Sequence, residues 1–238
     1  MSENNFVITT FYKFVKIENP DLVVDEIKDL LLKNEVKGTV LIANEGINST
    51  IAGTRDGVSN FYKYCNSNEL FSDIFFKESF CSFIPFGKLK VKHRKEIVSF
   101  DYQVDSYQKG NQVPPQEWDK FIERDDVILV DSRNDYEYDI GTFKGAINPN
   151  IKTFRQFYDW LKDRKEEFKE KKIASFCTGG VRCEKLQQKM IEDGFEFYQL
   201  EGGIINYFNQ TRNQNNKWLG GCFVFDDRFV VDSDMESK

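Results

Sequence analysis

The stretch SFCTGGVRCEK, residues 175–185, contains the residue types whose order best suits chemistry. Cys177 is a thiol, and the loop that follows it comprises Thr178, Gly179, Gly180, Val181 and Arg182. A glycine pair lets backbone N–H groups turn inward and bind an anion, and the arginine adds positive charge. Such surroundings lower the pKa of a cysteine, so they favour a catalytic thiolate at Cys177. A small buried thiol at a tight turn is the alternative, and it fits this combination of features less well.

The elements on either side of the loop predict how it is positioned. Ile173–Phe176 reads as a buried strand and Arg182–Asp193 as a helix. Loops at the carboxyl ends of parallel strands commonly hold functional sites, and a helix N-terminus adds partial positive charge. Cys183 falls in the first turn of this helix. Its thiol either packs inward, which we favour, or serves as a redox partner that forms a disulfide with oxidised Cys177.

Strands and helices alternate through the rest of the C-terminal half. The expected strands are Val127–Val130, Ile173–Phe176 and Phe197–Leu200, and the expected helices are 134–141, Thr153–Lys165, Arg182–Asp193 and a helix after Glu201–Gly203. This alternation predicts a parallel sheet covered on both faces. Glu201–Gly203 lacks a dinucleotide fingerprint, so we interpret it as a structural loop near the site.

The N-terminal half has a different order of elements. The expected order is strand Phe6–Val15, helix Pro20–Lys33, strands Thr39–Ala43 and Ser49–Ala52, a helix after Thr54, and strand Asp73–Phe80. Strand-helix-strand-strand-helix-strand is the ferredoxin-like arrangement. The polar stretch SYQKGNQVPP, residues 106–115, is the expected linker. The sequence therefore predicts an α/β protein with an α+β domain at 1–105 and an α/β domain at 116–238.

Basic residues alternate with other residues in GKLKVKHRKE. Lys88, Lys90, Lys92 and Arg94 would lie on one face of a strand. Such a row can follow the phosphates of a nucleic acid. It can equally be a solvated edge strand whose lysines prevent aggregation, and the residues alone do not decide between these interpretations.

Polar residues also occupy the turn between the second and third strands. Asn44, Glu45 and Asn48 either close that turn or line a surface that binds substrate, and we favour the second interpretation.

Composition excludes several classes of protein. The net charge of −6 argues against a protein that coats nucleic acid with its whole surface. The single histidine, His93, excludes an intrachain metal site that needs two histidines, and we expect no metal. No flavin or nicotinamide fingerprint is present, so no cofactor is expected. Five unpaired cysteines, no signal peptide and no apolar stretch of about 20 residues indicate a cytoplasmic protein with reduced thiols and no membrane span.

CTGGVR resembles the active-site loop of the rhodanese superfamily. VDSRNDYEYDIGTFKGAIN is similar to a further superfamily segment, with matches at Asp131, Arg133, Glu137, Gly141, Gly145 and Ala146. The resemblance implies that Asp131 and Arg133 support the site, and Thr142 stands where many modules have histidine. Arg182 follows Cys177 by five residues, whereas related phosphatases use six, which argues against phosphatase chemistry.

Together with ANEGINSTIAG, IGTFKGAINP, CTGGVRCEK, YQLEGGIINY and the basic segment, the chain resembles bacterial tRNA uridine(34) hydroxylases over about residues 6–231. The resemblance implies a ferredoxin-like domain followed by a rhodanese-like domain. It also implies oxygen-dependent conversion of the wobble uridine to 5-hydroxyuridine, with Cys177 as the catalytic residue and dioxygen as co-substrate. The implied partner is the anticodon arm of tRNA, which favours an RNA-binding role for the basic row, with no DNA. Many members carry a cysteine-rich C-terminal extension, so a short form is expected here.

Two other functions remain open on the sequence. A sulfurtransferase would carry a persulfide on Cys177 in the same loop, and a non-catalytic binding module would not need the thiol. Within the hydroxylase hypothesis, either Cys177 adds to C6 of the pyrimidine or an oxygenated sulfur forms at Cys177.

Overall fold

The computed structural model describes residues 6–102, 104, 107–108, 110–212, 214 and 216–237. These residues form two compact units. The N-terminal unit contains residues 6–97, 104 and 225–228, and the C-terminal unit contains the others. Within the described ranges, no helix has the length and apolar character that a membrane span requires.

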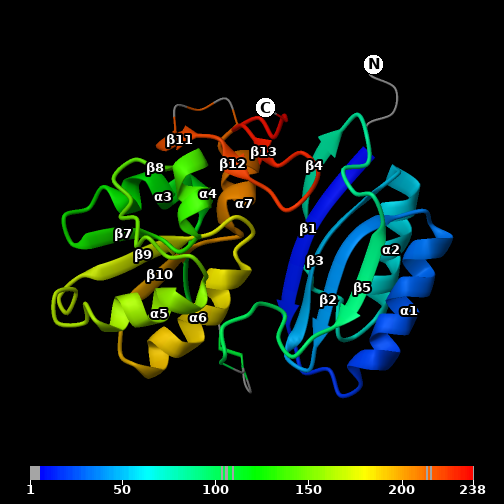
Figure 1. Cartoon of the computed structure of the whole chain (residues 1–238), viewed down its shortest axis with the longest axis horizontal. Helices are drawn as coiled ribbons and strands as arrows, with labels where there is room; N and C mark the ends of the chain where they lie inside the picture. The colour runs from blue at the N-terminus through cyan, green and yellow to red at the C-terminus, as the bar shows by residue number, and fades with distance from the viewer. Residues whose placement is uncertain are drawn as a thin grey trace. The chain divides into compact units, whose positions relative to one another are not determined.

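A five-stranded sheet in the order β4-β1-β3-β2-β5 forms the N-terminal unit. Its elements are β1 (Phe6–Phe14), α1 (Pro20–Lys33), β2 (Lys37–Ala43), β3 (Gly46–Gly53), α2 (Arg55–Ser67), β4 (Lys77–Cys81) and β5 (Leu89–His93). Helices α1 and α2 cover one face of the sheet (Figure 1). The first four strands follow the expected ferredoxin-like order, and β5 extends the sheet by pairing parallel to β2.

Successive side chains along each strand of this sheet point to opposite faces. Val40 and Ile42 lie in the core under the helices, whereas Leu41 between them is partly exposed on the other face. The fourth strand begins at Lys77 rather than at the expected Asp73, because residues 68–74 form turns.

The C-terminal unit contains a four-stranded parallel sheet in the order β6-β10-β9-β7. Its elements are β6 (Asn111–Val113), α3 (Pro115–Ile122), β7 (Val127–Asp131), α4 (Asp135–Ile140), β8 (Gly141–Phe143), α5 (Arg155–Lys162), β9 (Lys172–Phe176), α6 (Val181–Glu192), β10 (Phe197–Leu200) and α7 (Gly203–Gln210), followed by β11 (Trp218–Gly220), β12 (Cys222–Phe223) and β13 (Val230–Val231). The α/β prediction with a parallel sheet is therefore confirmed.

Both faces of this sheet are buried. Leu129 and Ala174 point into a core with α3 and α7, and their neighbours Val130 and Ile173 point into a second core with α5 and α6. Two covered faces explain why β7 and β9 are apolar without alternation.

Several elements differ from the sequence expectation. The predicted linker 106–115 includes Ser106 and Lys109, which lie outside the described residues; its described part contains β6, which pairs with β10. Helix α5 ends at Lys162 because residues 163–171 continue as turns. The short pairs β8–β11 and β12–β13 were not expected from the sequence.

Candidate active site at Cys177

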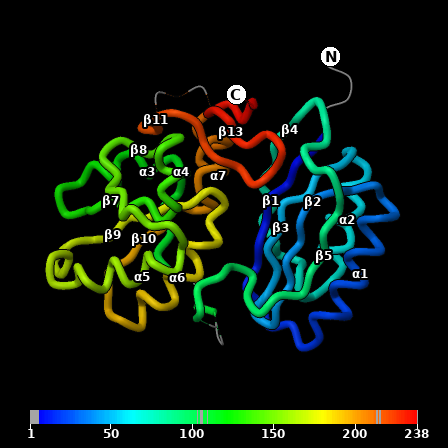
Figure 2. Tube along the Cα trace, in the orientation of Figure 1, coloured from blue at the N-terminus to red at the C-terminus, as the bar shows by residue number. Residues whose placement is uncertain are grey.

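Cys177 lies in the connection between β9 and α6, and the tube in Figure 2 follows the chain through this turn. Gly180 caps α6 with a left-handed backbone φ of 98°. Residues with a side chain rarely adopt this conformation. This geometry lets the backbone N–H of Gly180 donate to the sulfur of Cys177 at 3.2 Å. The loop thus forms the expected turn at the carboxyl end of a parallel strand, with its sulfur at the helix N-terminus.

A second helix N-terminus supports the loop from α7. The backbone N–H of Ile204 donates to the carbonyl of Cys177 at 3.0 Å, and that of Ile205 donates to Thr178 at 3.1 Å. Gly203 has a φ of 73°, and a Cβ there would lie 2.5 Å from the Cys177 carbonyl oxygen. The segment Glu201–Gly203 therefore fixes the backbone of the cysteine loop.

Replacing Gly203 with alanine should displace this loop. The added Cβ would also lie 2.6 Å from the Gly180 nitrogen, so backbone must move. We expect a loss of about 2–4 kcal/mol in unfolding free energy, from left-handed strain plus overpacking. Gly194→Ala is the matched control, since its φ is 75° and nothing lies within 4 Å of its Cβ. Urea unfolding should give the control only the strain cost of about 1–2 kcal/mol. Equal losses in the two variants would show that the Gly203 contact with the loop is unimportant.

Arg182 forms a buried ion pair rather than presenting an unpaired charge. Its two terminal nitrogens each donate to a carboxylate oxygen of Glu137 at 2.7 Å. Glu137 also accepts the backbone N–H of Asn134 at 3.2 Å and the hydroxyl of Thr178 at 3.3 Å. Burial opposes the charge of Glu137, but Arg182 holds the pKa of this carboxyl below its usual value. Glu137 thus links helix α4 to the cysteine loop.

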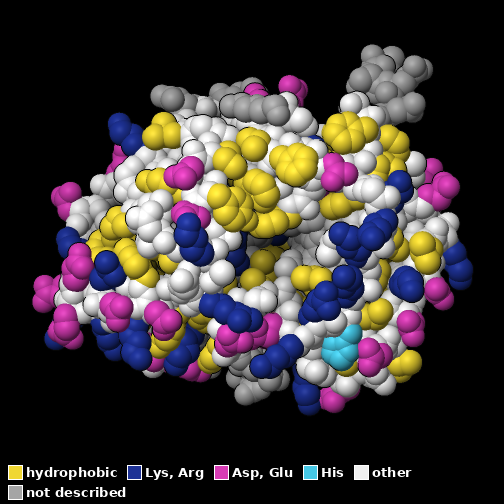
Figure 3. Space-filling view, in the orientation of Figure 1, with side chains coloured by type: hydrophobic (Ala, Val, Ile, Leu, Met, Phe, Trp, Pro, Cys, Tyr) yellow, Lys and Arg dark blue, Asp and Glu magenta, His cyan; other side chains and the backbone are white. Residues whose placement is uncertain are grey.

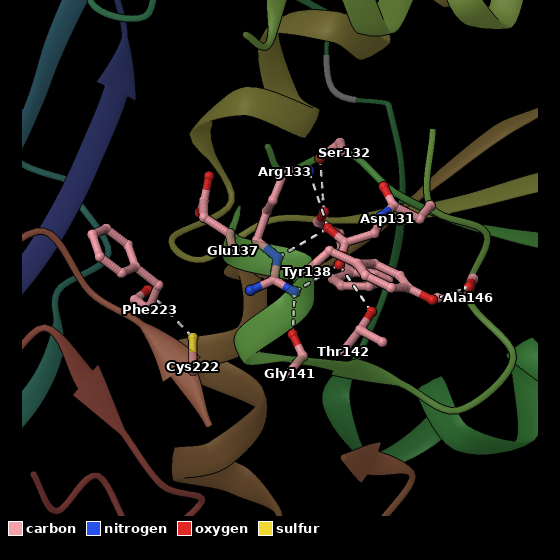
Figure 4. A network of polar contacts seen from close by, with 12 residues as sticks. Asp131, Ser132, Arg133, Glu137, Tyr138, Gly141, Thr142, Ala146, Cys222 and Phe223 are labelled. Atoms are coloured by element: carbon pink, nitrogen blue, oxygen red, sulfur yellow. Dashed lines mark hydrogen bonds and ion pairs between the residues drawn. The ribbon is translucent and has the colours of Figure 1, made fainter. Parts of the chain in front are cut away.

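The expected supporting residues Asp131 and Arg133 form a second buried ion pair at the end of β7. Arg133 donates to the two Asp131 oxygens at 2.9 and 2.6 Å and to the Gly141 carbonyl at 2.6 Å (Figure 4). Thr142, at the position where related modules often have histidine, donates its hydroxyl to Asp131 at 2.9 Å. This network fixes the strand end beside α4.

Two thiols share the site. The Cys183 thiol lies 3.2 Å from the hydroxyl of Ser132 and interacts electrostatically with Cys177. Burial alone would raise the pKa of Cys177, but the interaction with Cys183, the Arg182 charge and two backbone N–H groups lower it to about 5. Burial and the neighbouring thiolate raise the pKa of Cys183. The site therefore holds a thiolate beside a protonated thiol.

The ultraviolet absorbance of the thiolate should titrate with a midpoint near pH 5 in the wild type. The step should be absent from Cys177→Ala. The usual thiol pKa is about 8.5, so the folded state stabilises the thiolate. This stabilisation is complete above pH ~8.5 and is lost as the pH falls through about 5. Cys222→Ala is the control, because burial raises the Cys222 pKa to about 12. A Cys177 midpoint above pH ~8 would contradict the geometry.

The predicted basic row lies on the edge strand β5 and beside it. Lys90 and Lys92 are exposed, and Leu89 and Val91 pack toward the helices on the opposite face. Lys88 and Arg94, which flank the strand, are exposed as well. Figure 3 shows Lys and Arg side chains gathered over this edge beside the single histidine.

The polar residues predicted for the turn between the second and third strands have internal partners, although only Asn44 and Glu45 form the turn and Asn48 lies in β3. Glu45 is buried and accepts the backbone N–H of Ile97 at 2.8 Å, and Asn48 donates to the Ile97 carbonyl at 2.9 Å. The exposed Asn44 donates to the Ile17 carbonyl at 3.0 Å. Register places Asn48, Leu41 and Lys92 in one row across the face that the helices leave uncovered. Contact of these residues with RNA stays a prediction, and Glu45 has a structural role.

Sequence reasoning missed the partner of Arg182. Asn134 and Glu137 have the spacing of a capping box, which could have placed the Glu137 carboxylate at the start of a helix. The pairing with Arg182 joins residues 45 positions apart, which no local pattern shows.

Comparisons with known proteins cover both halves of the chain. Residues 6–97 match the model of the UPF0176 acylphosphatase like domain, and residues 114–210 match that of the Rhodanese-like domain. A protein of Legionella pneumophila (strain Paris), named tRNA uridine(34) hydroxylase, is 45% identical over 98% of this chain and 92% of its own length. Proteins of the same name from Wolbachia sp. subsp. Brugia malayi (strain TRS) and Acinetobacter baumannii (strain AYE) are each 43% identical over 97% of this chain, covering 86% and 74% of their own lengths.

Proposed function

This chain belongs to the tRNA uridine(34) hydroxylase family, and we propose that it converts the wobble uridine of tRNA to 5-hydroxyuridine, with dioxygen as co-substrate. The observation that carries this proposal is the buried Cys177 thiolate in a loop held by two helix N-termini and the Glu137–Arg182 pair. A nucleophile of this kind is what a pyrimidine ring requires for activation at C5. The proposed location is the cytoplasm, where tRNA is found.

Cys177 is the nucleophile in this proposal. Its thiolate adds to C6 of uracil, forming a carbon–sulfur bond and moving the C5–C6 electron pair onto C5 and the O4 carbonyl. C5 becomes electron-rich and receives one oxygen atom of dioxygen as a hydroxyl, while an external two-electron donor and two protons reduce the other oxygen atom to water. Loss of the C5 proton and departure of the thiolate restore the aromatic ring and the enzyme. The Gly180 N–H and the Arg182 charge that stabilise the thiolate also favour its departure.

The anticodon arm is the proposed contact with tRNA. A uridine in a single-stranded loop can be unstacked and placed against a side chain, as RNA-modifying chemistry requires. The exposed row Lys88, Lys90, Lys92 and Arg94 supplies positive charge for the phosphates.

The double variant Lys90→Ala/Lys92→Ala should bind an anticodon stem-loop roughly tenfold more weakly. The slope of log affinity against log salt should fall by about 1–2, because two phosphate contacts are lost. Fluorescence anisotropy across a salt series measures both quantities. Lys33→Ala/Lys63→Ala removes the same charge from exposed positions of α1 and α2, and it should leave binding unchanged. If both double variants bound the stem-loop equally weakly, the loss of affinity would come from the net charge of the protein and not from the position of Lys90 and Lys92.

A deletion strain provides the direct test of the function. Mass spectrometry should find 5-hydroxyuridine derivatives at position 34 missing from its tRNA and restored when this chain is expressed. Unchanged tRNA in the deletion strain, together with efficient thiosulfate sulfurtransfer by the purified protein, would overturn the proposal.

A further inference from the structure

The cysteine loop contains a second thiol that hydroxylation by Cys177 does not use. Cys183 is fully buried in the first turn of α6, six residues after Cys177, and the two thiols interact electrostatically. Its sulfur lies 3.2 Å from the Ser132 hydroxyl and 3.9 Å from that of Ser175. These contacts, with Gly180 holding the other sulfur at 3.2 Å, keep both sulfurs at the junction of β9 and α6.

The two thiols are in complementary states for thiol–disulfide chemistry. A thiolate reacts with small oxidants, and the neighbouring protonated thiol is the group that can displace the product. All five cysteines are free in this structure. Cys222 is also buried, and its thiol donates to the backbone carbonyl of Phe223 at 3.6 Å.

We propose that Cys177 and Cys183 form a reversible dithiol centre, in which a peroxide oxidises Cys177 and Cys183 captures the product as an intramolecular disulfide. The Cys177 thiolate attacks one peroxide oxygen, which breaks the O–O bond and gives a sulfenic acid and hydroxide. The sulfur of Cys183 then loses its proton and displaces the sulfenic oxygen as water. Overall, two thiols and one hydrogen peroxide give one disulfide and two waters, and the sulfurs lose the two electrons that the peroxide gains.

This centre protects the active-site sulfur. A sulfenic acid without a nearby thiol proceeds to sulfinic and sulfonic acids, which a thiol reductant cannot reverse. A disulfide between Cys177 and Cys183 prevents further oxidation of Cys177. A dithiol reductant can reduce this disulfide and restore the active thiolate. The inference concerns the protein alone, so its test does not depend on the proposed reaction with tRNA.

Trypsin makes the linkage directly measurable. Cleavage after Lys172, Arg182 and Lys185 places Cys177 in the peptide 173–182 and Cys183 in the peptide 183–185. The full-length protein is treated with hydrogen peroxide, alkylated, digested and examined by mass spectrometry. We expect the two peptides to be joined, with a mass two hydrogens below their sum, and to separate after treatment with dithiothreitol.

Cys183→Ser keeps a hydrogen-bonding group of similar size and removes the second sulfur. In this variant, Cys177 should accumulate sulfinic acid at least about tenfold faster than in the wild type, and Cys183→Ala should behave in the same way. Cys222→Ser is the control, and it should still form the joined peptide. The proposal is overturned if the wild type accumulates sulfinic acid as fast as Cys183→Ser, or if Cys177 pairs with another cysteine. Circular dichroism of each variant establishes that the comparison is between folded proteins.

Discussion

Replacing Cys177 with serine should lower 5-hydroxyuridine formation by about a thousandfold or more, because the reaction loses its nucleophile. The loop stabilises a thiolate with a pKa of about 5. A serine hydroxyl in the same place stays protonated, because its pKa is far higher than that of a thiol. The substitution is nearly isosteric, so the loop backbone and its contacts with α7 should persist. The measurement is nucleoside mass spectrometry of tRNA from the deletion strain expressing the variant.

Cys81→Ser is the matched control for this loss. Cys81 is a free, partly exposed cysteine at the end of β4 in the N-terminal unit. Activity of this variant should equal that of the wild type. The thiolate role would be wrong if Cys177→Ser, expressed and folded to the same extent, restored more than about a tenth of the modification.

Asp131→Asn should destabilise the C-terminal unit by about 3–5 kcal/mol, because it leaves the Arg133 guanidinium buried without its counter-charge. Both side chains are fully buried. Arg133 would keep its hydrogen bond to the Gly141 carbonyl and its positions over the rings of Trp218 and Phe176, at 5.1 and 5.7 Å, and none of these neutral groups replaces the lost carboxylate. Urea unfolding followed by tryptophan fluorescence isolates the effect, because Trp118, Trp160 and Trp218 all belong to this unit.

The chain contains its own control for this prediction. Asp126 and Arg124 are also two residues apart and form two hydrogen bonds, at 2.9 and 2.8 Å. Their side chains are 42% and 50% exposed, so water solvates either partner when the other is removed. Asp126→Asn should therefore shift the urea midpoint only slightly. Similar shifts for the two variants would mean that burial of the Asp131–Arg133 pair has no energetic consequence.

The cysteine loop and the alternation of elements could be predicted from sequence because their determinants are local. A buried strand, two glycines and a helix start lie within about a dozen residues of Cys177, and each has a short-range signature. The order of strands and helices in the N-terminal unit is likewise encoded by periodicity. The additional pairing of β5 with β2 could not be derived in this way, because it joins residues about 50 positions apart.

The electrostatics of the site could be predicted only in part. Arg182 was expected to add positive charge to the loop, but its partner Glu137, in a helix that precedes it by more than 40 residues, was not predicted. The burial of Glu45 in the N-terminal unit could not be predicted from the sequence either. A glutamate in a turn reads as exposed, yet this one is buried by a chain segment around Ile97 that arrives some 50 residues later. Ion pairs and buried carboxylates are decided by tertiary neighbours, which local patterns do not contain.

Residues 225–228 belong to the N-terminal unit, although the chain on both sides of them belongs to the C-terminal unit. Within this segment, Arg228 is buried, pairs with Asp226, and donates to the Ser79 hydroxyl at 3.1 Å. During synthesis on a ribosome, the N-terminal unit therefore cannot complete its fold when its own strands emerge. The hydrogen bond between Arg228 and Ser79 can form only after all four strands of the C-terminal parallel sheet have been synthesised.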